Sequence, residues 1–290
     1  MPKVTATLQQ LLTSKIKGEL LGAERIMKIM AELKRQVLVE LATAPGGSFG
    51  TARLQQTLAA IDAHLATWET RTRSEAAGLL ESSWEAGKEL LPAMAEAAGM
   101  QVGRFWISTA QLDALKDFAL GRFAHVRTDA SARIRAEVTL GILGQKTPQE
   151  VTAAVAGELG SPSIFKSIEA RAETITKTEM GRAYSMATQK SLEASTDVLP
   201  ELQKMWLHAG HPKRARIYHL NIHGLTVPIA ERFLVGNIGM MYPRDPTAPA
   251  SEVINCGCTH VPYMAEWGSK KEFLTSWDKA QKAANSRKGA

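Results

Sequence analysis

Hydrophobic residues recur at mixed spacings of three and four positions along most of the first 195 residues, which is the pattern of helices with one apolar stripe. The first such run covers residues 5–43, and the Pro- and Gly-containing segment 44–50 ends it. The same pattern predicts further long helices over residues 51–98, 108–143 and 163–195. We therefore expect a chain that begins with a mostly α-helical part.

Local signals add detail to these helices. Thr147 is followed by Pro148 and Glu150, so the Thr and Glu side chains can cap each other's backbone N–H groups, which predicts a short helix over residues 148–158. Polar residues are dense in the helix over 163–195, and this density predicts a face exposed to solvent. The polar residues in question are Arg171, Glu173, Thr178, Glu179 and Arg182.

The pattern changes near residue 198, where prolines and glycines become frequent and short β-prone segments appear. We expect strands near residues 204–209, 225–229 and 258–264 and a final helix over residues 269–285. The predicted fold class is α+β, with a long, mostly helical N-terminal part and a small α+β module that ends in a C-terminal helix. The predicted division is a helical docking or stalk region, 1–160, and a module, 161–290.

Composition restricts the class of protein. Hydrophobic residues make up 44% and charged residues 22% of 290 residues, which are ordinary globular values, and the 6% of aromatic residues agrees with a helix-rich chain. Two cysteines cannot form a disulfide framework. No segment has the pattern of a signal peptide or the ~18 apolar residues of a membrane span. We expect synthesis in the cytoplasm and no membrane partner.

Positive charge is concentrated in the last third of the chain. The net charge is +6, and residues 201–290 hold 12 Lys and Arg against 7 Asp and Glu. Lys213, Arg214 and Arg216 lie beside Tyr218, which is a combination suited to contacts with nucleic-acid phosphates. The segment is therefore a candidate for binding double-stranded DNA. A solvated helix start would have the same composition, and this alternative stays open.

The same region gathers residues that bind metals. Both cysteines, Cys256 and Cys258, and five of the seven histidines lie within 53 residues. Thiolate and imidazole are the ligands of zinc sites, and His219 and His223 are spaced to share one helix face. The spacing Cys-Gly-Cys is one residue shorter than that of a zinc knuckle. The candidate ligands are Cys256, Cys258, His219 and His223, with His208 or His260 as substitutes, and zinc is the candidate ion.

Two other interpretations of these residues remain open. Cys256 could act as a nucleophile if a neighbour lowered its pKa, and His208, Arg216, His219 and Asp245 are types found in nucleases and acyl-transfer sites. No catalytic motif specifies such a reaction. The two cysteines could also be small buried residues without chemistry.

Several short strings in the last third resemble, in order, the phage Mu F-like minor head protein family, also called phage head morphogenesis proteins. The resemblance covers about residues 165–263. The strings are TITKTEMGRAY at 174–184, WLHAGHPKRARIYH at 206–219, HLNIHG at 219–224, MYPRDP at 241–246 and VINCGC at 253–258. His223 stands where the family tends to have an acidic residue and Gly257 where it tends to have a basic one, which leaves His223 without family support as a ligand.

The resemblance implies a virion protein located inside the head near the portal, which assists head assembly and DNA packaging or ejection. Its partners would be the portal protein, capsid or scaffold components and packaged DNA. It implies no catalysis. The alternative is a nuclease-like or toxin-like effector carried in the virion, because modules of this family are found joined to effector domains. The first 160 residues would then be the effector, and they lack clustered His, Asp or Glu.

Overall fold

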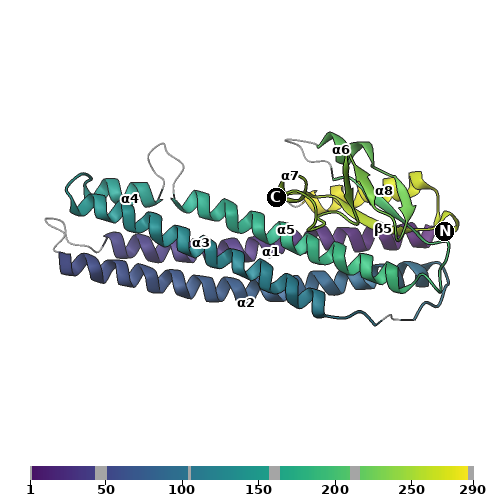
Figure 1. The fold of residues 1–290 in the computed structure, drawn as a ribbon, viewed down its shortest axis with the longest axis horizontal. Helices are drawn as coiled ribbons and strands as arrows, with labels where there is room; N and C mark the ends of the chain where they lie inside the picture. Colours follow the sequence, from purple (N-terminus) through teal and green to yellow (C-terminus); the bar gives the residue numbers. More distant parts are fainter. Residues whose placement is uncertain (1, 43–50, 104–105, 157–163, 210–215, 287–290) are drawn as a thin grey trace. The chain divides into compact units, whose positions relative to one another are not determined.

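The computed structural model describes residues 2–42, 51–103, 106–156, 164–209 and 216–286. These residues form eight α-helices, one 3-10 helix and five short strands, which confirms the α+β class (Figure 1). The helices are α1 (Pro2–Ala42), α2 (Thr51–Ala97), α3 (Ala110–Ile142), α4 (Pro148–Ala156), α5 (Ile164–Ala194), α6 (Ile217–Asn221), α7 (Ala250–Val253), η1 (Ala265–Trp267) and α8 (Lys270–Asn285). The strands are β1 (Gln203–Leu207), β2 (Thr226–Pro228), β3 (Phe233–Val235), β4 (Ile238–Met240) and β5 (Thr259–Tyr263).

The long helices expected from the apolar periodicity are all present. Helix α2 continues through Gly78 and Gly87 without a break. The capping box before α4 is also confirmed: the backbone N–H of Thr147 donates to Glu150 Oε2 at 2.7 Å, and that of Glu150 to Thr147 Oγ1 at 3.2 Å. Local sequence signals were sufficient here because each element depends on residues close to it in the chain.

The chain divides into two compact units, and neither is continuous in sequence. One contains residues 1–21, 79–115 and 177–290, and the other contains residues 22–78 and 116–176. We call the first the strand unit, because all five strands belong to it. The predicted boundary between residues 160 and 161 lies outside the described residues, and the predicted division stays a prediction.

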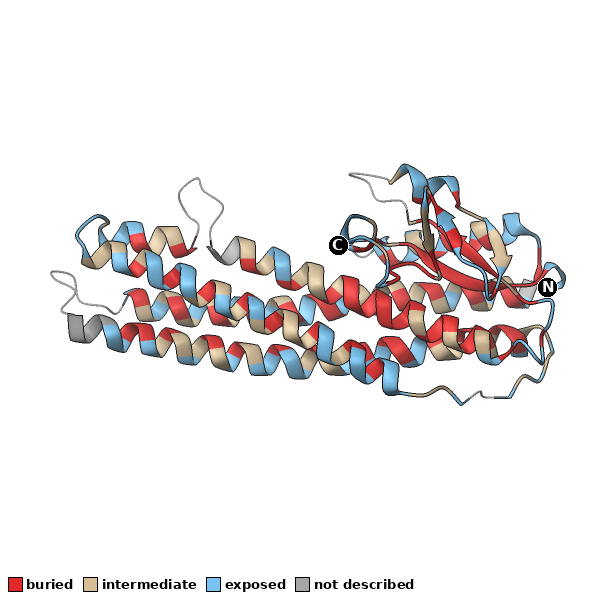
Figure 2. Cartoon of the chain, viewed as in Figure 1, coloured by how far each residue is buried: buried red, intermediate tan, exposed pale blue. Residues whose placement is uncertain are grey.

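The strand unit is built around a three-stranded antiparallel sheet of order β2-β1-β5. Side chains alternate along β1, so Met205 and Leu207 pack into a core with the helices, while Trp206 joins a second apolar cluster on the opposite face. The helical side of the core includes Leu8, Leu12, Leu90, Leu91, Tyr184, Leu192, Phe273 and Trp277. The start of α1 is thus part of the same core as β5 and α8. Figure 2 shows the strands β1 and β5 as largely buried.

The second apolar cluster carries the two cysteines. It contains Trp206, Phe233, Met240, Cys256 and Cys258, with the hairpin β3-β4 covering it. The ring of Phe233 meets that of Trp206 edge to face, with centroids 5.2 Å apart. The strands β3 and β4 have three residues each and were not predicted, because so short a segment shows no alternation.

The expectation of a solvated polar face on α5 was wrong for its C-terminal half. Thr178, Glu179 and Arg182 are only 3%, 3% and 5% exposed. Arg182 forms an ion pair with Glu179 and donates through Nε to the carbonyl oxygen of Arg244 at 3.1 Å. These polar groups are buried because a loop distant in sequence satisfies them, which periodicity along α5 does not reveal.

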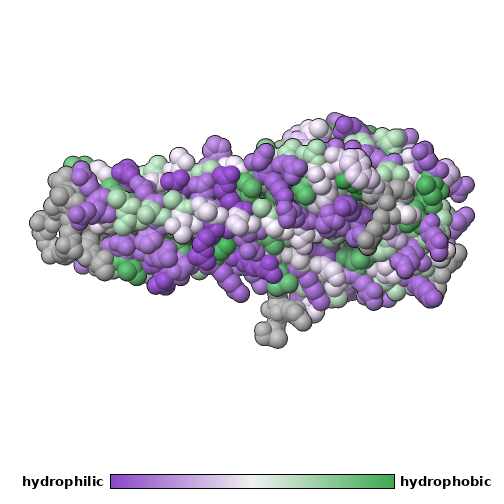
Figure 3. Space-filling view, turned by 90° about the horizontal axis from the view of Figure 1, so that it is seen from below, coloured by the Kyte–Doolittle hydropathy of each residue, from purple (hydrophilic) through white to green (hydrophobic). Residues whose placement is uncertain are grey.

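On the face shown in Figure 3, hydrophilic residues predominate and apolar residues form small separate areas. Among the described residues, no helix combines the length and the apolar character that a bilayer span requires.

Lys204 of β1 is a buried cation whose titration should affect stability. Its Nζ donates to the carbonyl oxygen of Met241 at 2.8 Å and to Gln189 Oε1 at 3.1 Å, and burial lowers its pKa to about 8. Between this pH and the ordinary lysine pKa of about 10.4, the unfolded chain holds a proton that the folded chain releases. The free energy of unfolding should therefore rise with pH in this window.

We expect this rise to be about 2 kcal/mol between pH 8 and pH 10. Urea unfolding of the wild type and of Lys204→Met at pH 8 and pH 10 would measure it, since other titrating groups cancel in the comparison. An equal pH dependence in both proteins would show that Lys204 is not responsible.

Candidate metal centre

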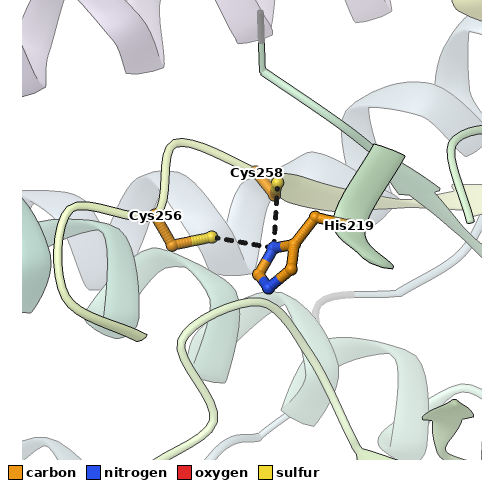
Figure 4. A group of neighbouring side chains, drawn as sticks. All are labelled: His219, Cys256 and Cys258. Carbon is orange, nitrogen blue, oxygen red and sulfur yellow. Dashed lines mark hydrogen bonds between the residues drawn. The ribbon is translucent and has the colours of Figure 1, made fainter. Parts of the chain in front are cut away.

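Three of the four predicted ligands converge on one point in the strand unit (Figure 4). Nδ1 of His219 lies 3.6 Å from Sγ of Cys256 and 3.5 Å from Sγ of Cys258. All three side chains are buried, with exposed fractions of 1%, 2% and 2%. The three ligand atoms lie within 4.8 Å of one another.

The local backbone explains how two cysteines so close in sequence reach one histidine. Helix α7 ends at Val253, and Asn255 adopts a left-handed conformation with φ of 56°. The chain therefore turns at Asn255, just before Cys256, and β5 begins at Thr259.

Helix α6 supplies the histidine. It is one short turn that starts after Arg216, and His219 is its buried residue. The guanidinium of Arg216 donates to the carbonyl oxygen of Ile254 at 2.7 Å, which connects the start of α6 to the segment before the cysteines. Gly224 follows with φ of 80°, a conformation that favours glycine and ends the turn.

Glu252 orients the histidine ring and was not predicted. Its Oε2 lies 2.8 Å from His219 Nε2, so that nitrogen can carry the proton and donate to the carboxylate. Nδ1 is then left with its lone pair directed at the two sulfurs. A carboxylate on the second nitrogen of a ligating histidine is a recurrent feature of zinc sites. The sequence signal for this carboxylate is its place in SEVINCGC, where Glu252 lies four residues before Cys256.

Electrostatics favour an ionised thiol in this cluster. The neighbouring Cys258 thiol and the His219 ring hold the pKa of Cys256 well below the usual thiol range, in spite of its burial. Burial alone would lower the pKa of His219, but the Cys256 sulfur and the Glu252 carboxylate outweigh it and raise that pKa. Thiolates are the form in which cysteines bind metals.

The donor set and its spacing fit zinc. With a Zn–N distance of about 2.05 Å and a Zn–S distance of about 2.3 Å, a tetrahedral ion places nitrogen and sulfur ligands about 3.6 Å apart. The two N···S distances of 3.6 and 3.5 Å match this value. His219, Cys256 and Cys258 could therefore hold a zinc ion.

The other predicted ligands lie elsewhere. Nδ1 of His223 accepts the backbone N–H of His208 at 3.0 Å, and the two rings are 6.4 Å apart. His260 lies on β5 with its ring stacked on Tyr242, and burial lowers its pKa well below the usual range. Among the described residues, none of these three histidines joins the cluster. Lys213 and Arg214 lie outside the described residues.

Removing the Glu252 carboxylate should weaken metal binding without removing a ligand. We expect Glu252→Ala to reduce zinc affinity by about 10- to 100-fold, the usual effect of losing such a partner. Glu252→Gln should lie between, because its amide oxygen can still accept from Nε2 but carries no charge. Competition with a chromophoric zinc chelator would measure the affinities, with the exposed Glu231→Ala as control. Unchanged affinity in Glu252→Ala would exclude this role.

Comparisons with known proteins match only part of the chain. Over 87 residues, or 30% of this chain, it is 34% identical to "NAD(+)--arginine ADP-ribosyltransferase EFV" of Enterococcus faecalis, of which the match covers 18%. Over 97 residues it is 33% identical to the uncharacterized protein YqbB of Bacillus subtilis, of which the match covers 31%. The chain thus spans less than a third of the length of either relative. No family model and no solved structure matches the chain.

Proposed function

We propose that this chain is a structural minor head protein of a phage, located inside the head near the portal, and that zinc stabilises its strand unit. The proposal is supported by the way the residues of the resembling strings gather at one place. His219 contacts both cysteines, Arg216 bonds the carbonyl of Ile254, and Arg244 donates to the carbonyl of Cys258 at 3.4 Å. These contacts connect residues of three of the resembling strings, those at 206–219, 241–246 and 253–258.

In this proposal the metal is structural and the chain has no catalytic role. Its partners are the portal protein and capsid or scaffold components, and it assists head assembly and DNA packaging or ejection. Lys213, Arg214 and Arg216 are the proposed contacts to double-stranded DNA. Because one guanidinium nitrogen of Arg216 already bonds Ile254, this residue has fewer donors left for phosphate.

The match to an ADP-ribosyltransferase keeps an effector enzyme as the second candidate. The matched segment covers only 18% of that protein, so the likeness concerns one segment of a much longer chain. We propose that the segment is a shared module and that the transferase activity belongs to that relative. Incubating the purified chain with labelled NAD⁺ and an arginine-rich acceptor separates the candidates, and transfer of label would favour the effector.

Quantitative mass spectrometry of purified particles of the source phage tests the head assignment. We expect the chain in few copies per particle and protected from protease added to intact particles. Its absence from particles, when it is present in the lysate, would contradict the proposal.

A further inference from the structure

Large apolar side chains are exposed in unusual number around helix α6. Among the described residues, twelve large hydrophobic side chains are at least 37% exposed, and six of them lie between residues 217 and 254. Soluble proteins scatter such residues singly, and a group of them marks an interaction surface. The six are Ile217, Tyr218, Leu220, Leu225, Leu234 and Ile254.

Contacts hold most of these side chains in one area. A methyl group placed on Gly236 would lie 3.0 Å from the Tyr218 ring, so this ring lies directly on the turn between β3 and β4. Leu234 is on β3, 63% exposed, between the buried Phe233 and Val235. The hydrogen bond from Arg216 to the carbonyl oxygen of Ile254 places Ile254 next to the start of α6. We define the α6 patch as Ile217, Tyr218, Leu220, Leu234 and Ile254.

Helix α6 exposes apolar side chains that its own packing does not require. Its buried residue is His219, while Ile217, Tyr218 and Leu220 are 58%, 54% and 44% exposed. An apolar side chain gains nothing from contact with water, and packing alone gives no reason for three of them on one turn.

Basic side chains border the patch. Arg216 precedes α6 and its described contact is a neutral carbonyl oxygen. Arg232, whose side chain is 50% exposed, lies next to β3 and forms an ion pair with the buried Asp245 at 3.4 Å. An apolar centre with a cationic border is complementary to leucine-like side chains bordered by carboxylates. DNA would use the cations but would leave the apolar centre without a partner.

We propose that the α6 patch binds a protein partner that presents an amphipathic helix with leucine-type side chains and an acidic border. This goes beyond the metal site and the head assignment and does not depend on either. The interaction is of the helix-on-surface kind, in which a few apolar anchors supply most of the affinity and the charges set the orientation.

A labelled peptide of about five helical turns, made of Leu, Ala and Glu with the leucines on one face, is a suitable probe. Fluorescence anisotropy with the full chain should give a dissociation constant of about 10–100 µM. Ile217→Ser together with Leu220→Ser should weaken binding by at least about tenfold. Val198→Ser is the matched control, because Val198 is 57% exposed and lies outside the patch.

Three further measurements decide between occupants. A peptide with Lys in place of Glu should bind more weakly, and equal binding would contradict the acidic border. Binding that is absent, or is the same in the double variant, would overturn the proposal. Preference of the patch for a DNA duplex, or self-association of the chain lost in the double variant, would overturn it in favour of those partners. An unchanged melting temperature shows that the double variant remains folded.

Discussion

Replacing Cys258 by serine should abolish zinc binding and lower the melting temperature of the strand unit by about 10 °C. Its sulfur lies 3.5 Å from His219 Nδ1 in a buried cluster, and serine is a poor zinc ligand. An ion present at about a thousand times its dissociation constant stabilises the folded state by about 4 kcal/mol, and each kcal/mol shifts the melting temperature of a unit this size by about 2–4 °C. Metal analysis and thermal unfolding by circular dichroism measure the two effects.

The control for this experiment is His223→Asn. The asparagine side chain can still accept the backbone N–H of His208, as Nδ1 of His223 does at 3.0 Å. We expect this variant to keep its zinc and its melting temperature, because His223 is outside the cluster. A chelator should lower the melting temperature of the wild type and leave that of Cys258→Ser unchanged. Zinc retained in Cys258→Ser or lost in His223→Asn would mean that the ligands are wrongly assigned.

Replacing Gly87 by alanine should destabilise the strand unit by about 2–4 kcal/mol. A β-carbon at this position would lie 2.3 Å from the backbone carbonyl oxygen of Tyr184 and 2.9 Å from the β-carbon of Ala187. Relief of this overlap requires α2 and α5 to separate, because a backbone atom cannot rotate away as a side chain can. The loss should exceed the gain of about 1 kcal/mol from the better helix propensity of alanine.

Gly18→Ala is the matched control, since Gly18 also lies in a helix of the strand unit and a β-carbon there meets no atom within 4 Å. This change should stabilise the protein by up to about 1 kcal/mol. Urea unfolding of both variants measures the difference. Equal stability of the two variants would show that α2 and α5 are not in close contact at Gly87.

The long helices could be predicted because their signal is local and repeats many times. The apolar stripe of α1 places Leu8 and Leu12 correctly in a core, but it does not show that this core includes Val261 and Trp277, from the other end of the chain. The polar residues of α5 show the same limit. Arg182 is buried against Arg244, 62 residues later, and a pattern read along one helix has no information about such a partner.

Three ligands of the candidate site could be predicted from the sequence, whereas the choice among the remaining histidines could not. The concentration of Cys and His identified Cys256, Cys258 and His219, because those residue types are rare elsewhere in the chain. The choice of His223 assumed a helix long enough to present both rings on one face, whereas α6 ends at Asn221. His260 was a candidate substitute ligand, but in the structure its ring stacks on Tyr242.

X-ray absorption spectroscopy at the zinc edge of the purified chain tests the metal centre most directly. We expect about one zinc per chain, with two sulfur ligands at about 2.3 Å and at least one nitrogen ligand at about 2.0–2.1 Å. Less than about 0.2 zinc per folded chain, or a first coordination shell without sulfur, would contradict it.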